Sequence, residues 1–293
     1  MFKKIIIAVD LSTESYVLTN CLSGLKTYGT QECLVLMCLS IQQSTSVALS
    51  YANEVIEDTL AHLKDSVEKQ GFTADTRIIV GNAKHEINKI AEEEDYSLII
   101  VGAEQDSMLK SHLFGGIGFD VISFAKKPVL LIRINENFRN GEICVESVGC
   151  DIGNHILFPT DFSENADIAF DFLEKMVIDG AKKITLLHIQ DKSKIIPHLE
   201  YKLAEFDRID SERLESMKKK LERYGDAKIT TLIRLGTPAI EIINLVKELN
   251  VQLVVLGSQG RGFVEELFIG SVSNTVARKS DASVLLVPAR REI

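Results

Sequence analysis

The sequence has no long apolar run and few cysteines. Its 293 residues contain no stretch of 18 consecutive apolar residues, which excludes a transmembrane helix. The apolar segment after Lys4 is too short for a signal-peptide core. Five cysteines form an odd, scattered set that is not typical of a disulfide framework, although Cys144 and Cys150 could pair instead of remaining free thiols. We therefore expect a cytoplasmic protein without a membrane partner.

The sequence also has no basic stripe. Its formal net charge is −9, and its run of lysines, at positions 218–220, lies among Glu215, Glu222 and Arg223. That mixture is typical of a solvated helix face. A nucleic-acid-binding protein normally shows a positive surface, so we do not expect nucleic acid as a partner.

Motifs of several enzyme classes are missing. The chain contains no Gly-x4-Gly-Lys-Ser/Thr loop, no Gly-x-Ser-x-Gly elbow, no His-Glu-x-x-His and no zinc-spaced cysteines. These absences exclude a P-loop ATPase and give no support to a serine hydrolase or a zinc enzyme. We expect at most weak ATP hydrolysis, and we assign no catalytic residue and no metal ligand.

The sequence does contain an internal repeat, in which one unit occurs twice. Asp10 and Asp161 end two similar apolar segments and lie 151 positions apart. The later matches are all 155 positions apart, so a single four-residue change in length between the second and third strands accounts for both spacings. Ordered matches of this kind indicate a duplicated fold. They include Gly81 with Gly236, Glu86 with Glu241, Gly102 with Gly257, Gly115 with Gly270 and Leu130 with Leu285.

In each copy, short apolar strands alternate with amphipathic helices. This alternation is typical of an α/β fold whose parallel sheet is covered by helices on both faces. Helices are predicted at residues 47–70 in the first copy and at 163–178, 198–224, 238–249 and 271–280 in the second. Strands are predicted at 4–10, 33–39, 74–80, 97–101 and 128–133, and again at 155–159, 183–189, 227–235, 253–257 and 283–288.

The periodicity also predicts the domain limits. Two domains, residues 1–134 and 154–293, are joined by a linker at 135–153. The linker lacks a helical or strand period and contains asparagine and glycine turns, although residues 143–145 could form a short extended segment.

The stretch that follows the fourth strand of the second copy is the most informative. Its glycines, within residues 257–262, let a ligand approach the backbone closely. Gly270 and Ser271 open the next helix, where free N–H groups and the helix dipole favour a phosphate. Arg261 adds a positive charge, and Ser271 and Ser273 add hydroxyl donors. Composition alone is equally compatible with a surface turn followed by a serine cap.

The spacing Gly257-x2-Gly260-x9-Gly270-Ser271 resembles the nucleotide-binding signature of the universal stress protein family. Residues 159–163 and 186–189 resemble that family's first and second strands, and Gly236-x-Pro238 resembles its third-helix entrance. The resemblance covers both halves apart from the linker. It implies two tandem flavodoxin-like, Rossmann-like domains, each with a five-stranded, mostly parallel sheet in the order 3-2-1-4-5 and helices on both faces.

The resemblance also implies a ligand in the second half, ATP or AMP, with Mg²⁺ as a candidate companion of ATP. Asp161 would contact the ribose or the adenine, the backbone of Ile189 would hold the adenine edge, and Gly257 would lie against the ribose. Asp161 could also cap the following helix, and His188 is interpreted as a satisfied core histidine. The implied binding residues are Pro159, Thr160, Asp161, Ile189, Gly257, Ser258, Gly260, Arg261, Gly262, Gly270, Ser271, Val272 and Ser273, of which Gly260, Arg261, Gly270, Ser271 and Ser273 would surround the phosphates.

The first copy departs from this pattern. Gln105 stands where the second glycine should be, and Gly116 replaces the hydroxyl residue. Glu104 and Asp106 would place negative charge near any phosphate, which weakens binding by repulsion. Asp10 is retained. We therefore predict a degenerate first site that binds no nucleotide triphosphate.

Three functions remain open. The first is a cytoplasmic stress-response protein whose bound adenine nucleotide regulates its partner interactions. The second is a slow ATPase switch, and the third is a ligand-free scaffold or dimerisation protein. The last strands of the copies, residues 129–133 and 284–288, are edge candidates. The two domains could therefore pair as an intramolecular pseudo-dimer, and two chains could also form a homodimer.

Overall fold

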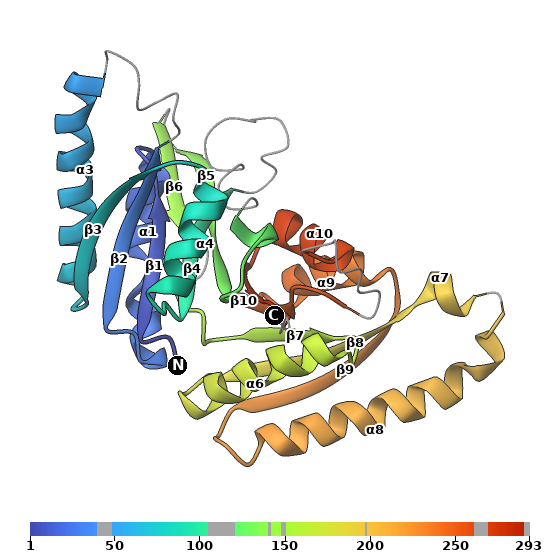
Figure 1. Cartoon of the computed structure of the whole chain (residues 1–293). Helices are drawn as coiled ribbons and strands as arrows, with labels where there is room; N and C mark the ends of the chain where they lie inside the picture. Colours follow the sequence, from blue (N-terminus) through green and yellow to red (C-terminus); the bar gives the residue numbers. More distant parts are fainter. Residues whose placement is uncertain are drawn as a thin grey trace. The chain divides into compact units, whose positions relative to one another are not determined.

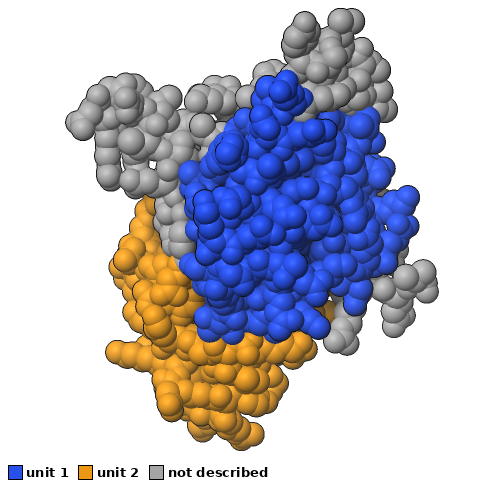
Figure 2. Space-filling model, turned by 90° about the vertical axis from the view of Figure 1, so that its left-hand side faces the viewer, with its two compact units in different colours: residues 1–150 blue, residues 151–293 orange. Residues whose placement is uncertain are grey.

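The chain forms two compact units, Met1–Cys150 and Asp151–Ile293, coloured separately in Figure 2. A computed structural model describes residues 1–39, 49–104, 121–139, 142–147, 151–196, 198–260 and 269–289. Both units are α/β, with strands and helices alternating along the chain (Figure 1).

The first unit is built on a parallel sheet in the order β3-β2-β1-β4-β5. A further strand, β6, pairs antiparallel with the second half of β5, from Ile134 opposite Ser147 to Arg139 opposite Glu142. Because of this hairpin, β5 runs further than the predicted strand at 128–133. β6 lies in the stretch that carries no period in the sequence. The strands are β1 (Lys4–Val9), β2 (Glu32–Leu39), β3 (Thr73–Val80), β4 (Leu98–Glu104), β5 (Val129–Arg139) and β6 (Glu142–Ser147).

Helices of the first unit pack through apolar stripes. In α3 the residues Ile56, Leu60, Leu63 and Val67, spaced by three or four positions, are all buried. The helix α3 packs against α1 and against β3. The helices are α1 (Thr13–Asn20), the 3₁₀ helix η1 (Ser23–Tyr28), α3 (Leu49–Lys69) and α4 (Ala83–Glu93).

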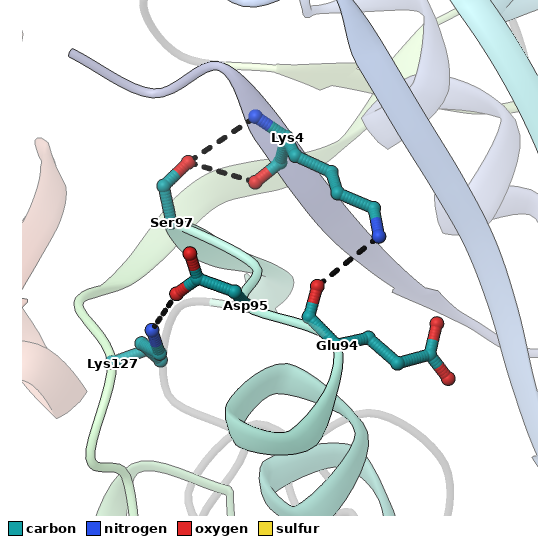
Figure 3. Close-up of polar contacts among 5 residues, drawn as sticks. All are labelled: Lys4, Glu94, Asp95, Ser97 and Lys127. Carbon is teal, nitrogen blue, oxygen red and sulfur yellow. Dashed lines mark hydrogen bonds and ion pairs between the residues drawn. The ribbon is translucent and has the colours of Figure 1, made fainter.

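Polar contacts connect the N-terminal end of β1 with the turn that precedes β4 (Figure 3). The Lys4 ammonium donates to the carbonyl of Glu94 at 3.1 Å, and the Ser97 hydroxyl donates to the carbonyl of Lys4 at 2.8 Å. Asp95, whose φ of 52° lies in the left-handed region, accepts from Lys127 at 2.7 Å. These contacts hold the turn between α4 and β4 at the sheet edge opposite the carboxyl ends of the strands.

The second unit repeats the first. Its sheet is parallel throughout in the order β9-β8-β7-β10-β11, so the predicted order 3-2-1-4-5 is confirmed in both halves. Every residue of β7, β10 and β11 is buried, as expected when helices cover both faces. The strands are β7 (Ile156–Thr160), β8 (Lys183–Asp191), β9 (Lys228–Gly236), β10 (Leu253–Gly257) and β11 (Ser283–Val287).

The helices of the second unit lie on both faces of its sheet: α6 and α8 on one, α9 and α10 on the other (Figure 1), as right-handed crossovers require. The helix predicted at 198–224 is observed as the 3₁₀ helix η2 followed directly by α8. A short helix that was not predicted, α7, precedes them, and the Asp191 side chain caps α7 by accepting from the Ser193 amide at 3.0 Å. The helices are α6 (Glu164–Ile178), α7 (Lys192–Ile195), the 3₁₀ helix η2 (Glu200–Lys202), α8 (Leu203–Leu221), α9 (Pro238–Glu248) and α10 (Ser271–Lys279).

The structure bears on two features of the sequence, the lack of a long apolar run and the small number of cysteines. None of the helices that the structure describes is both long and apolar enough to cross a membrane. Cys33 and Cys38 carry free thiols, whereas Cys21 is disulfide-bonded. The bond of Cys21 was not predicted from the sequence.

Candidate functional site

A cavity of about 980 Å³ lies at the carboxyl ends of the strands in the second unit. Because β7 lies between β8 and β10, the loops that follow β7 and β10 meet there, which is where ligands bind in open parallel sheets. The volume is near the upper end of the range of about 300–1,000 Å³ for small-molecule sites. Of the residues expected from the sequence, the cavity lining brings together Pro159, Thr160, Asp161, Ile189, Gly257, Gly260, Gly270, Ser271, Val272 and Ser273.

The turn after β7 presents Asp161 to the cavity. Phe162 has a φ of 57°, a left-handed conformation that is strained for a bulky residue and persists only where neighbours support it. The Thr160 hydroxyl accepts from the Phe162 amide, and the Asp161 carboxylate accepts from the Ser163 amide, both at 3.0 Å. Ser163 caps α6, since its hydroxyl accepts from the Ala166 amide at 3.3 Å. The side-chain cap is thus Ser163, and Asp161 lies two residues earlier, in the cavity wall.

Gly260 has a steric reason to be glycine. A Cβ at this position would lie 2.8 Å from Oδ2 of Asp161, closer than carbon and oxygen atoms approach without displacement. A side chain at position 260 would therefore displace the Asp161 carboxylate, which glycine leaves in place.

Gly257 has a different close neighbour, the buried Asn165 of α6. A Cβ at position 257 would lie 2.7 Å from Oδ1 of Asn165. That oxygen accepts from the Gln259 amide at 2.8 Å, and the Asn165 amide group donates to the carbonyl of Val287 at 3.3 Å. Asn165 thus fastens α6 to the strand ends and needs glycine at 257. Sequence reasoning did not identify Asn165, whose one signal is a polar residue in the first turn of an apolar helix.

The entrance of α10 forms the far end of the cavity. The helix begins at Ser271, and its N-cap residue Gly270 has no side chain to satisfy the first N–H groups. The Gly270 amide donates to the carbonyl of Ser258 at 2.7 Å. Ser271 is exposed, whereas the Ser273 hydroxyl donates to the carbonyl of Gly257 at 2.8 Å. The first turn of α10 can hold an anion, with the hydroxyl of Ser271 beside it.

Three of the expected residues lie outside the described lining. Ser258 is buried, and its amide donates to the carbonyl of Val287 at 2.7 Å. Arg261 and Gly262 lie outside the described residues.

Residues of helix α8 line one side of the cavity, which the sequence did not predict. Gln190 of β8 is buried and donates to the carboxylates of Asp207 and Asp210, both at 3.0 Å. His188 is buried as well, and its Nδ1 lies 2.8 Å from the carbonyl oxygen of Thr160. It is a satisfied core histidine, as predicted, yet it also lines the cavity, together with Arg213. Within the described residues, no three His, Cys, Asp or Glu side chains form a cluster that could hold a metal ion.

The corresponding turn of the first unit shares the bond from the amide two residues on and adds a hydroxyl donor. The Asp10 carboxylate accepts from the Ser12 amide at 2.8 Å and from the Ser15 hydroxyl at 3.2 Å. Burial raises the pKa of Asp10, against the opposing effect of the hydrogen bonds from Ser12 and Ser15. The residues 105–120, which include Gln105 and Gly116, lie outside the described part of the chain.

Two tandem flavodoxin-like domains with a cavity at a topological switch point define the class of this protein. A model of the universal stress protein family matches residues 1–133 and 153–288. The chain belongs to the universal stress protein family.

Individual relatives agree with this assignment. Over 151 residues the chain is 31% identical to universal stress protein MJ0577 of Methanocaldococcus jannaschii, an overlap of 45% of this chain and 93% of that protein. A universal stress protein of Mycolicibacterium smegmatis is 24% identical over 253 residues, 85% of this chain and 78% of that protein. The crystal structure of a universal stress protein from Archaeoglobus fulgidus covers 98% of this chain and 97% of its own, with a TM-score of 0.74 and 23% identity. That likeness shows the tandem fold.

Proposed function

We propose that the second half binds an adenine nucleotide, ATP or AMP, and that the bound nucleotide regulates the interactions of a cytoplasmic stress-response protein with its partners. One observation carries this proposal: a single cavity joins the Asp161 carboxylate to the first turn of α10. A carboxylate suits the hydroxyls of a ribose, and a helix amino end suits a phosphate. Membership of the universal stress protein family supports the same ligand.

The cavity suggests a role for each part of the nucleotide. The backbone of Ile189, which follows the last register pair of β7 and β8, would hold the adenine edge. Asp161 would contact the nucleoside, and Gly270 and Ser271 would contact the phosphates together with Arg261. The Mg²⁺ ion would enter with ATP, bound mainly by its phosphates.

Calorimetry of the dialysed chain against ATP, ADP and AMP tests the proposal. We expect binding, and we expect Gly270→Asp to weaken it at least about tenfold, because a carboxylate would occupy the phosphate position. A Cβ at 270 would meet its nearest neighbours at 3.5–3.7 Å, an ordinary contact distance, so the fold should tolerate this variant.

The matched control is Asn250→Asp. Asn250 follows α9 at the amino edge of the sheet, and its left-handed φ of 50° suits aspartate. The substitution Asn250→Asp adds the same charge away from the cavity and should leave nucleotide binding unchanged. Equal affinities of the wild type and Gly270→Asp would overturn the proposal.

The same preparation separates the alternatives. A ligand-free scaffold would bind none of the three nucleotides. A slow ATPase switch would release phosphate from ATP over hours, faster with Mg²⁺ than without it. A chain that binds ATP and releases no phosphate is a binding protein.

We also propose the domain limits 1–134 and 154–293, with the two domains acting as an intramolecular pseudo-dimer. Sedimentation at increasing concentration distinguishes a chain that remains monomeric from one that also forms a homodimer.

A further inference from the structure

The last three residues of β8 line the side of the cavity away from α10. β7 pairs with β8 only as far as Thr160 opposite His188, whereas β8 continues to Asp191. Because β7 lies between β8 and β10, a nucleotide with its phosphates at the first turn of α10 and its ribose at Asp161 places its base over the end of β8. All three residues that run past β7, at 189–191, line the cavity.

Helix α8, which packs against β8 and β9 (Figure 1), brings Asp210 to this side of the cavity. The amide nitrogen of Gln190 donates to Oδ1 of Asp207 and to Oδ2 of Asp210, both at 3.0 Å. Carboxylates only accept hydrogen bonds, so both hydrogens of this nitrogen are used and the orientation of the amide follows. Gln190, which is 4% exposed, therefore fixes the direction of the Asp210 carboxylate.

The other oxygen of Asp210 is open. Nε2 of His188 lies 3.5 Å from Oδ2, the same oxygen that Gln190 binds. Arg213, three positions further along α8, places its guanidinium 4.5 Å from the centroid of the Phe162 ring. Among the hydrogen bonds of the described residues, none reaches Oδ1 of Asp210.

This oxygen is also accessible. The Asp210 side chain is 13% exposed and lines the cavity. In the described part of the chain, Oδ1 is not among the enclosed side-chain atoms that lack a partner. It therefore opens into the cavity as an acceptor of fixed direction, next to the strand end where the base would lie.

We propose that Asp210 is a specificity-determining residue whose Oδ1 accepts a hydrogen bond from the exocyclic amino group of adenine. The proposal rests on the proposed function for its ligand. An amino group carries two hydrogens, so one can serve the backbone of Ile189 and the other Asp210. Hypoxanthine and guanine carry a carbonyl oxygen at the same ring position. Two acceptors would then face each other, and a site built for a donor rejects such an analogue.

The substitution Asp210→Asn inverts this preference without changing the shape of the side chain. Gln190 donates to the Oδ2 position, so the asparagine presents its carbonyl oxygen there. Its NH₂ group then takes the position of Oδ1. The atom that faces the base changes from an acceptor to a donor, which suits a carbonyl and not an amino group.

Calorimetry with AMP and with inosine monophosphate (IMP) tests the proposal, because the two ligands share their ribose and phosphate. We expect the wild type to bind AMP more tightly than IMP. In Asp210→Asn the ratio of the IMP to the AMP dissociation constant should fall at least about tenfold, the effect of one hydrogen bond to a charged group. IMP itself should bind more tightly than it does to the wild type. Contacts of the base with Ile189 are common to both proteins, so the change in the ratio reports position 210.

The matched control is Asp207→Asn. It makes the same substitution in the other carboxylate that Gln190 binds, and Asp207 is not among the residues that line the cavity. This variant should keep the wild-type ratio. Asp210→Ala supplies no donor in place of the acceptor, so it should weaken AMP and spare IMP.

The outcomes separate this proposal from the proposed function. A wild type that binds neither nucleotide would overturn the proposed function and this inference with it. Binding of both nucleotides with an unchanged ratio in Asp210→Asn and Asp210→Ala would overturn the role of Asp210 alone. The same fall of the ratio in Asp207→Asn as in Asp210→Asn would also overturn it, because the effect would then come from the charge of α8 and not from Oδ1.

Discussion

The two halves of the chain share a strand order but differ where their first strands end. In the second half the left-handed Phe162 follows Asp161, and Ser163 caps a helix of 15 residues. In the first half Asp10 is held by Ser12 and Ser15, and the helix that follows has eight residues. The aspartate and the backbone amide that donates to it, from Ser12 in the first half and Ser163 in the second, are retained in both copies. The second donor to Asp10, the Ser15 hydroxyl, has Ala166 as its counterpart. A duplicated motif therefore identifies a position whose side-chain surroundings can still differ between the copies.

The largest expected effect concerns the packing of α6. Gly257→Val should destabilise the second unit by about 3 kcal/mol, because its side chain would overlap Asn165. Urea unfolding measures this loss. Gly270→Ala, whose Cβ meets only ordinary contacts, should change stability little. In the first half Glu14 stands at the position equivalent to Asn165, so this contact is particular to the second half. Equal stabilities of the wild type and Gly257→Val would contradict the packing role.

The second prediction compares the two aspartates directly. Asp161→Asn should weaken AMP binding about tenfold or more, because it replaces a charged hydrogen-bond acceptor with a neutral one. Asp10→Asn should leave AMP binding unchanged. Calorimetry measures the AMP affinity of both variants against that of the wild type. Equal losses would mean that both halves contribute to binding.

The third prediction concerns acid stability. Desolvation by burial, and after it the charge of Lys183, lower the pKa of His155, against a hydrogen bond to the carbonyl of Leu249 that raises it. The folded state thus favours neutral His155. The stability that comes from neutral His155 is fully present above the pKa of histidine in the unfolded state, about 6.5. It is lost as the pH falls below that value.

As the pH falls below about 6.5, the second unit should consequently lose stability before the first unit does. In the first unit His62 and His85 are exposed. Urea unfolding near pH 7.5 and pH 5.5, followed by hydrogen exchange in each unit, measures the difference. His155→Gln should reduce the acid sensitivity of the second unit. An unchanged sensitivity would assign it to other groups.

The smallest expected effect is at Asp10. Burial raises the pKa of Asp10, so the folded state favours its protonated form. The stability that this provides is present below the unfolded-state pKa and is lost as the pH rises. At neutral pH the ionised carboxylate is therefore unfavourable, and Asp10→Asn should stabilise the first unit by no more than about 0.5 kcal/mol. Urea unfolding near pH 7 should show this gain, which should disappear in acid. A clear destabilisation near pH 7 would contradict the account.

Much of this fold could be predicted from the sequence. The repeated spacings and the alternation of strands and helices predicted both sheets, and the resemblance to universal stress proteins implied the strand order. Asp161, Gly260 and Gly270 line one cavity because adjacent parallel strands bring their loops together. The short helix α7 was not predicted, since its four residues are too few to show a helical period.

The remaining residues of the site could not be predicted. Asn165, Gln190, Asp210 and Arg213 depend on how α6 and α8 are rotated against the sheet. That rotation is set by tertiary packing and leaves no local pattern in the sequence. Gly257 illustrates the same limit, because its glycine has a packing reason in Asn165 that the spacing of the loop glycines does not reveal.

Equilibrium dialysis with radiolabelled AMP tests most directly the claim that the second half alone holds the nucleotide. We predict that binding saturates at one AMP per chain in the wild type and in Asp10→Asn, and that the dissociation constant of Gly270→Asp is higher by at least about tenfold. Two AMP molecules per wild-type chain, or an unchanged dissociation constant in Gly270→Asp, would contradict the claim.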